Sequence, residues 1–172
     1  MCRLPTKRTM CGWDGFPSQD KRRDKLQASE GEKAMLMIWT DGGCYPNPGP
    51  GGWGFVRSDG FESFGGAART TNNQMEMTAI IEAMKSVPDG GEVTIFADSQ
   101  YCINGLTIWK AGWVRKNWMK KGEPMPNRQH WLDLHFQQQR IKSNFKWVRG
   151  HSGNAGNERA DKLATMGRIT MA

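Results

Sequence analysis

The sequence predicts an α/β domain built on a mixed β-sheet, and three features of the chain support this. Two apolar runs, "AMLMIWT" at 34–40 and "EVTIFADS" at 92–99, are typical of buried strands, and each is closed by an aspartate. Between them, "WGFVR" and "FESFGGAA" flank "SDG" at 58–60, a pattern that indicates an antiparallel hairpin. Strands followed by helical spacing after that hairpin favour mixed pairing of the strands.

The remaining elements follow in chain order. A helix is predicted over 73–87, after the capping residues Thr71 and Asn72, and Pro88 with Gly90 ends it. The segment from Ser99 to Trp109 has helical spacing, and a basic stretch rich in tryptophan covers 110–128. We expect a helix over about 129–139, the strand "FKWVRG" at 145–150, the loop "HSGNAG" at 151–156 and a last helix over about 157–166.

The chain is expected to divide into a polar N-terminal extension, residues 1–33, and one globular domain, residues 34–172. The extension contains "KRRDK" and shows neither a helical nor a strand period, which predicts disorder, with a small docking segment as the alternative. Met35 and Met37 are further candidates for the original start of the protein. A domain of this length buries enough apolar surface to fold without disulfides or structural metal ions.

Composition narrows the class of protein. Lys plus Arg number 24 against 17 Asp plus Glu, so a formal charge of +7 favours a polyanionic partner, although many basic proteins bind nothing in particular. The four cysteines form no CxxC pair, which argues for free thiols and against zinc. No apolar run is long enough for a membrane span or a signal peptide, so we expect a cytoplasmic protein without a membrane partner.

Two of the acidic residues stand directly after the predicted buried strands. If these strands are parallel neighbours, Asp41 and Asp98 emerge together at the carboxyl edge of the sheet, where α/β proteins build their sites. Taken alone, Asp41 in "TDGGCYPNPGPGGWG" is equally typical of a turn with a solvated aspartate. Its glycine-proline loop is interpreted as a path that lets a ligand backbone approach.

Two further acids lie on helices. Glu76 falls in the middle of the apolar stripe of its helix, where it either forms a salt bridge with an arginine or binds a cation. Asp161 flanks the apolar face of the last helix, where a solvated position is the alternative.

Four converging carboxylates repel one another unless hard divalent cations neutralise them, and oxygen ligands select Mg²⁺ or Mn²⁺. Two such ions about 4 Å apart suit the hydrolysis of a phosphodiester. His151 is either a proton carrier for that chemistry or an ordinary surface histidine.

Four segments in order, "TDGGCYPNPGPGGWG", "TTNNQMEMTAIIEAM", "FADSQYCINGLTIW" and "WVRGHSGNAGNERADKLA", resemble ribonuclease H type 1, closely matching the bacterial enzymes. The resemblance runs from residue 34 to about 168. It implies a ribonuclease H-like fold with a five-stranded mixed sheet flanked by helices, and a catalytic domain over 34–172. It also implies an endonuclease that acts on the RNA strand of RNA–DNA hybrids, leaving 3′-hydroxyl and 5′-phosphate ends.

The resemblance implies a metal-binding tetrad of Asp41, Glu76, Asp98 and Asp161 for two Mg²⁺ ions, with Mn²⁺ as a substitute and His151 as the mobile-loop histidine. The loop around His151 keeps the histidine and the following Asn157–Glu158 pair but has its own internal residues. The resemblance further implies a monomer that binds the hybrid in a groove beside the acids and on a basic protrusion, residues 109–128. The substrate contacts that it implies are Gly42, Gly43, Cys44, Asn47, Thr71, Asn72, Asn73, Gln100, Trp109, Lys116, Lys120, Lys121 and Asn157. Trp113 and Trp118 are left open between stacking on the substrate and packing on the domain.

Two other classes compete with a hybrid-specific nuclease. A binding module with a dead site would have no reason to keep all four acids. Related transposase or exonuclease folds lack the "TTNNQME" helix start and the "GNE" segment. Cleavage of a labelled hybrid in the presence of Mg²⁺ separates the three.

Overall fold

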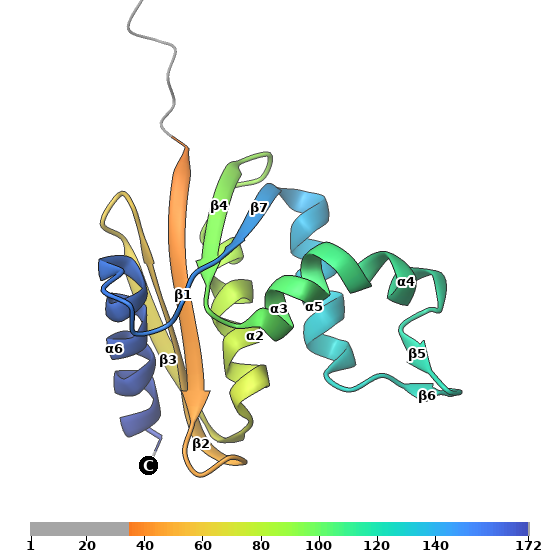
Figure 1. The fold of residues 1–172 in the computed structure, drawn as a ribbon, viewed down its shortest axis with the longest axis horizontal. Helices are drawn as coiled ribbons and strands as arrows, with labels where there is room; N and C mark the ends of the chain where they lie inside the picture. The colour runs from red at the N-terminus through yellow and green to blue at the C-terminus, as the bar shows by residue number, and fades with distance from the viewer. Residues whose placement is uncertain (1–34, 172) are drawn as a thin grey trace, which may run out of the picture. The chain divides into compact units, whose positions relative to one another are not determined.

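A computed structural model describes residues 35–171 (Figure 1). The predicted extension over 1–33 therefore lies outside the described residues. Within them, strands and helices alternate after an initial hairpin as expected. In chain order they are β1 (Leu36–Cys44), β2 (Gly49–Arg57), β3 (Glu62–Thr70), α2 (Asn72–Lys85), β4 (Glu92–Ala97), α3 (Gln100–Asn104), a π-helical turn η1 (Gly105–Trp109), α4 (Lys110–Arg115), β5 (Met119–Lys120), β6 (Glu123–Pro124), α5 (Arg128–Arg140), β7 (Lys142–Trp147) and α6 (Ala155–Ile169).

The main sheet has five strands in the order β3-β2-β1-β4-β7. Strands β1, β2 and β3 pair antiparallel, whereas β1 with β4 and β4 with β7 pair parallel. The predicted mixed sheet is thus confirmed. So is the expectation on which the site depends, that the two buried apolar strands lie side by side and point the same way.

Strand β1 continues past Asp41, which corrects the prediction that this residue closes the strand. The parallel pairing with β4 ends at Thr40 and Ala97, but the antiparallel pairing with β2 goes on to Cys44 and Gly51. Most of the glycine-proline segment therefore belongs to the sheet, and only residues 45–48 connect the two strands. Glycine, which weakens a strand in isolation, is accepted here because helices press directly on the sheet.

The C-terminal boundaries also differ from the prediction. Strand β7 begins three residues earlier than expected, because the polar residues 142–144 pair with 92–94 of β4 at the edge of the sheet. Helix α6 begins before Asn157, since the Asn154 side chain accepts the N–H of Asn157 and caps the helix. The predicted strand at 145–150 and helix start at 157 are therefore shifted.

Helices cover both faces of the sheet (Figure 1). On one face α2 packs so closely that a Cβ added at Gly42 would lie 2.3 Å from the backbone carbon of Met75. On the other face α6 rests on β2 and β3 through a glycine seam, in which a Cβ at Gly52 would lie 2.1 Å from the backbone oxygen of Ala164. Directly opposite residues of an antiparallel pair share a face, and Asp41 pairs with Gly54, whose added Cβ would also meet α6. Asp41 therefore points to the α6 face.

The core lies between the sheet, α2 and α5. Its largest fully buried apolar side chains are Trp131, Ile38, Met77, Ile80, Met84, Ile95, Leu134 and Val93, whereas the equally buried Leu163 lies on the other face, between α6 and β2. Beyond this core, α4 and the short β5–β6 ribbon extend away from the sheet (Figure 1). Among residues 35–171, no helix is long and apolar enough to cross a membrane.

Candidate active site

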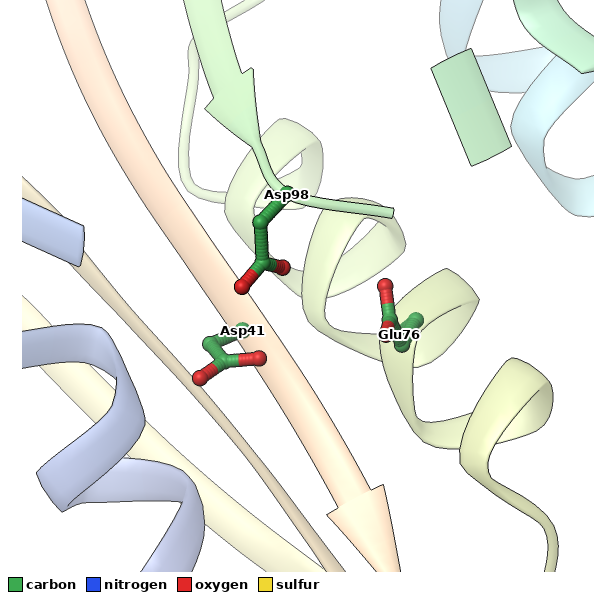
Figure 2. Close-up of side chains that lie close together, drawn as sticks. All are labelled: Asp41, Glu76 and Asp98. Carbon is green, nitrogen blue, oxygen red and sulfur yellow. The ribbon is translucent and has the colours of Figure 1, made fainter. Parts of the chain in front are cut away.

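Three acids from three separate elements meet at one edge of the sheet. Asp41 lies on β1, Asp98 follows the last residue of β4, and Glu76 lies on α2 (Figure 2). Each offers one carboxylate oxygen, and these oxygens lie within 4.8 Å of one another. We call Asp41, Glu76 and Asp98 the acidic cluster.

The register of the strands explains why these acids converge. Thr40 pairs with Ala97, so the next residues, Asp41 and Asp98, follow the last rung of the parallel ladder together. From Asp41 onward β1 has no β4 partner on that side, and Glu76 on the neighbouring helix shares the space with the two aspartates. The predicted convergence of two strand-end acids with Glu76 is therefore observed, although Asp41 itself is inside its strand.

Burial and mutual repulsion make it unfavourable for all three acids of the acidic cluster to be ionised at once. Burial, together with the charge of Asp98, raises the pKa of Asp41 to about 7. Burial likewise raises the pKa of Glu76 to about 8, with added repulsion from Asp98 and Asp41. Neither acid is paired with an arginine or lysine among the described residues, so the salt-bridge alternative for Glu76 is not observed.

Ser99 supports the cluster and was missed from the sequence. Its hydroxyl opposes the rise of the Glu76 pKa, and its Oγ accepts the N–H of Cys102 at 3.4 Å. Ser99 is thus both the cap of α3 and a neighbour of the acids. A serine between a strand-end aspartate and a predicted helix was a readable capping signal.

Asp161 lies next to the acidic cluster without belonging to it. It comes from α6 and lines the same cavity as Asp41, of about 370 Å³, together with Gly43, Cys44 and Asn72. Its charge contributes to the raised pKa of Asp41. The structure therefore brings the fourth predicted acid to the site from the opposite face to α2.

His151 is exposed and occupies the left-handed region, with φ of 51°, in the loop between β7 and α6. Its neighbour Gly150 borders the acidic cluster, since a Cβ there would lie 2.6 Å from Oδ2 of Asp98. The loop that carries the histidine thus begins at the cluster.

A polar network surrounds the turn between β1 and β2. The N–H of Cys44 donates to Oδ1 of Asn72 at 2.7 Å, and the Cys44 thiol donates to Oδ1 of Asn47 at 3.3 Å. The backbone N–H of Asn72 also donates to Asn47, at 3.4 Å. Three predicted contact residues are therefore neighbours. Gly42 is buried, so its lack of a side chain serves the packing of β1 on α2 rather than the access inferred from the sequence.

A second network joins the start of α2 to the base of the protrusion. Thr71 caps α2 by accepting the N–H of Gln74, and the Gln74 side chain accepts the Thr71 N–H in return. Gln74 also donates to Asn127 at 3.4 Å, and Asn127 donates to the hydroxyl of Tyr101 at 3.3 Å. The predicted capping role of Thr71 is confirmed, whereas the link through Gln74 was not foreseen.

The second cavity, of about 660 Å³, lies along the protrusion. Five predicted contact residues line it: Asn73, Trp109, Lys116, Lys120 and Lys121. Trp113 lines it as well and also packs against the core. Trp118 is only 7% exposed and belongs to the core.

Four predicted contact residues line neither cavity: Asn47 and Thr71, which belong to the two polar networks, and Gln100 and Asn157. Gln100 is exposed on the first turn of α3. Asn157 is only 2% exposed, because the first turn of α6 packs against the rest of the domain. Asn157 therefore lines neither cavity, its contact with the substrate stays a prediction, and its burial at a helix start could not be read from its sequence neighbours.

Comparisons with known proteins agree with this geometry. Residues 32–169 match the model of the RNase H family. The chain is 44% identical to the ribonuclease H of Gluconobacter oxydans over 147 residues, covering 83% of this chain and 98% of the relative. It is 45% identical to the ribonuclease H of Granulibacter bethesdensis over 148 residues, covering 84% and 99%.

A solved structure shares the fold. It is that of LC9-RNase H1, described as a type 1 RNase H with the type 2 active-site motif. The superposition has a TM-score of 0.71 at 25% identity and covers 80% of this chain and 74% of the other.

An acidic edge on a mixed α/β sheet, together with these relatives, defines an endoribonuclease, a hydrolase of nucleic-acid phosphodiesters. The chain belongs to the ribonuclease H family.

Proposed function

We propose that the domain formed by residues 34–172 is an endonuclease that hydrolyses the RNA strand of RNA–DNA hybrids, leaving 3′-hydroxyl and 5′-phosphate ends. The observation that carries this proposal is the acidic cluster, whose ligand oxygens lie within 4.8 Å of one another. Membership of the ribonuclease H family supports it.

The acidic cluster suits hard divalent cations. Its donors are all carboxylate oxygens, the ligands that Mg²⁺ and Mn²⁺ prefer. The raised pKa values of Asp41 and Glu76 come first from burial and then from repulsion between the acids, and a bound cation would offset both by favouring the charged carboxylates. We infer two Mg²⁺ ions, for which Mn²⁺ can substitute, and when bound they would supply charge to activate a water and to stabilise the leaving oxygen.

Each protein group has a separate task in the proposed reaction. The acidic cluster holds the cations at the sheet edge, and Asp161 completes the ligand set from α6. The hydroxyl of Ser99 favours the ionised form of Glu76, which is the form that binds a cation. His151, on the exposed loop beside Asp98, receives or delivers a proton as the scissile bond is cut.

The groove is proposed to distinguish RNA by its 2′-hydroxyls, which a hybrid displays on one strand of a wide minor groove. Short polar groups next to the cluster fit this task. Gly43, Cys44, Asn47 and Asn72 present backbone, thiol and amide groups around one cavity edge. Gln100 is proposed as a further contact from the start of α3.

The protrusion is proposed to hold phosphates without reading sequence. Lys116, Lys120 and Lys121 line the second cavity beside Trp109, and such charges contribute salt-dependent affinity. Asn73 connects this cavity to the start of α2. We expect the protein to act as a monomer.

The test is cleavage of a labelled RNA–DNA hybrid with Mg²⁺, beside single-stranded RNA, duplex RNA and duplex DNA of the same sequence. We expect internal cuts in the RNA of the hybrid alone, with products that a 5′-phosphate-dependent exonuclease degrades. Equal cutting of duplex RNA, or no cutting of the hybrid, would contradict the proposal.

A further inference from the structure

The last residue of β7 and the segment after it contact Ala97 and Asp98 at three points. Strand β7 lies beside β4 (Figure 1), and its last contact is the N–H of Val148 donating to the carbonyl of Ala97 at 3.0 Å. One residue earlier, the indole N–H of Trp147 donates to the backbone carbonyl of Asp98 at 2.9 Å. Gly150 then borders the carboxylate of Asp98.

The Trp147 contact holds a residue that otherwise has little support. Asp98 has already left the β-ladder, because the parallel pairing of β4 ends at Ala97. The ring of Trp147 is 47% exposed, so its side chain contributes less to the core than a buried tryptophan would. Its hydrogen bond fixes the peptide plane at Asp98, and with it the direction of the Asp98 side chain.

The Gly150 contact constrains the carboxylate itself. A Cβ at Gly150 would lie 2.6 Å from Oδ2 of Asp98, closer than real Cβ atoms approach any atom. The backbone of Gly150 is outside the left-handed region, so alanine is compatible with its conformation. The conflict with Asp98 is therefore the main reason for glycine at this position.

We propose that Trp147 and Gly150 are positioning residues that set the Asp98 carboxylate in the geometry needed to bind a divalent cation. Trp147 acts through the backbone of Asp98, and Gly150 acts by leaving room for Oδ2. The inference rests on the proposed metal-binding role of the acidic cluster. It adds that this role depends on the strand neighbouring β4 as well as on the acids.

The experiment measures Mn²⁺ binding by isothermal titration calorimetry on the full chain without nucleic acid. Trp147→Phe keeps an aromatic ring but removes the donor, and we expect the dissociation constant to rise about two- to tenfold. Gly150→Ala forces the carboxylate or the loop to move, and we expect a rise of about ten- to a hundredfold, typical of groups that orient metal ligands.

Two control variants separate positioning from stability. Gly112→Ala adds a methyl group where no atom lies within 4 Å, and Trp118→Phe shrinks a ring in the core away from the cluster. Both should leave Mn²⁺ affinity within about twofold of the wild type, a limit set by ordinary variation between distant sites. The second should still lower the Tm.

The inference is overturned if Trp147→Phe and Gly150→Ala lower only the Tm and bind Mn²⁺ like the wild type. If Trp147→Phe does not fold, Gly150→Ala alone decides the matter by the same measurement. A wild-type protein that binds Mn²⁺ but leaves hybrids intact would refute the proposed function and leave this test valid. A wild type without any affinity for Mn²⁺ would refute both.

Discussion

Replacing Asp98 by asparagine should stabilise the metal-free protein at alkaline pH while abolishing cleavage. The ligand oxygens of the acidic cluster lie within 4.8 Å of one another, and two unit charges at about that distance repel by about 3.5 kcal/mol at an effective dielectric constant of about 20. Solvent at the open side of the site screens part of this. We therefore expect a net gain of about 2 kcal/mol, or roughly 4–8 °C in Tm.

The pH dependence of this gain follows from the raised pKa values. A carboxyl whose pKa is higher in the folded state favours folding below its unfolded pKa, and this contribution is lost as the pH rises through the folded value. For Asp41 and Glu76 those folded values are about 7 and about 8. At pH 5 both acids are mostly protonated and Asp98→Asn should change little, whereas at pH 8.5 both acids are mostly ionised and most of the repulsion that it removes is present.

The assay is thermal unfolding in EDTA at pH 5 and pH 8.5, followed by circular dichroism, with hybrid cleavage measured in Mg²⁺. Glu92→Gln is the matched control, because it makes the same chemical change at an exposed residue at the other end of β4. An equal gain at both pH values would refute the reasoning from charge repulsion. Retained cleavage by Asp98→Asn would refute the assignment of Asp98 as a metal ligand.

Three further predictions follow from the same description. Cation binding must displace protons from the acidic cluster at low pH, so calorimetry should show Mn²⁺ affinity rising at least about tenfold between pH 6 and pH 8.5; a flat profile would contradict the raised pKa values. Replacing Lys116, Lys120 and Lys121 by alanine should raise KM with little change in kcat, and should reduce the salt slope of hybrid binding by up to about 3; an unchanged slope would exclude the protrusion as a phosphate contact. Gly42→Ala should lower the free energy of unfolding by about 2 kcal/mol or more in urea titrations, since its Cβ would lie 2.3 Å from the backbone of Met75, and a neutral effect would show that α2 can shift away.

The sequence was sufficient for the features that depend on pattern. Apolar runs closed by aspartates predicted two buried strands whose acids would meet if the strands were parallel, and the capping residues Thr71 and Asn72 predicted the start of α2 to within one residue. Glu76 attracted attention because an acid in an apolar stripe is costly without a partner. These signals predicted the acidic cluster from the amino-acid sequence alone.

The features that the sequence did not reveal depend on pairing between distant segments. Asp41 was placed at a strand end because the pairing of β1 with β2 beyond it has no local signature. The polar start of β7 was missed because an edge strand need not show buried alternation. Asn157 looked accessible because its burial comes from the packing of α6, and Gln74 acquires its link to Asn127 only when residues 53 apart meet.

The glycine seam under α6 has a consequence for the fourth acid. At this seam the backbone of β2 contacts the backbone of α6 directly. A side chain could adjust to a change in spacing by adopting another rotamer, but backbone atoms cannot, so close packing fixes the distance between α6 and the sheet. A methyl group at Gly52 would act as a wedge that lifts Asp161 while leaving the other three carboxylates in place. Such a variant would separate the contribution of Asp161 from that of the acidic cluster without altering a single charge.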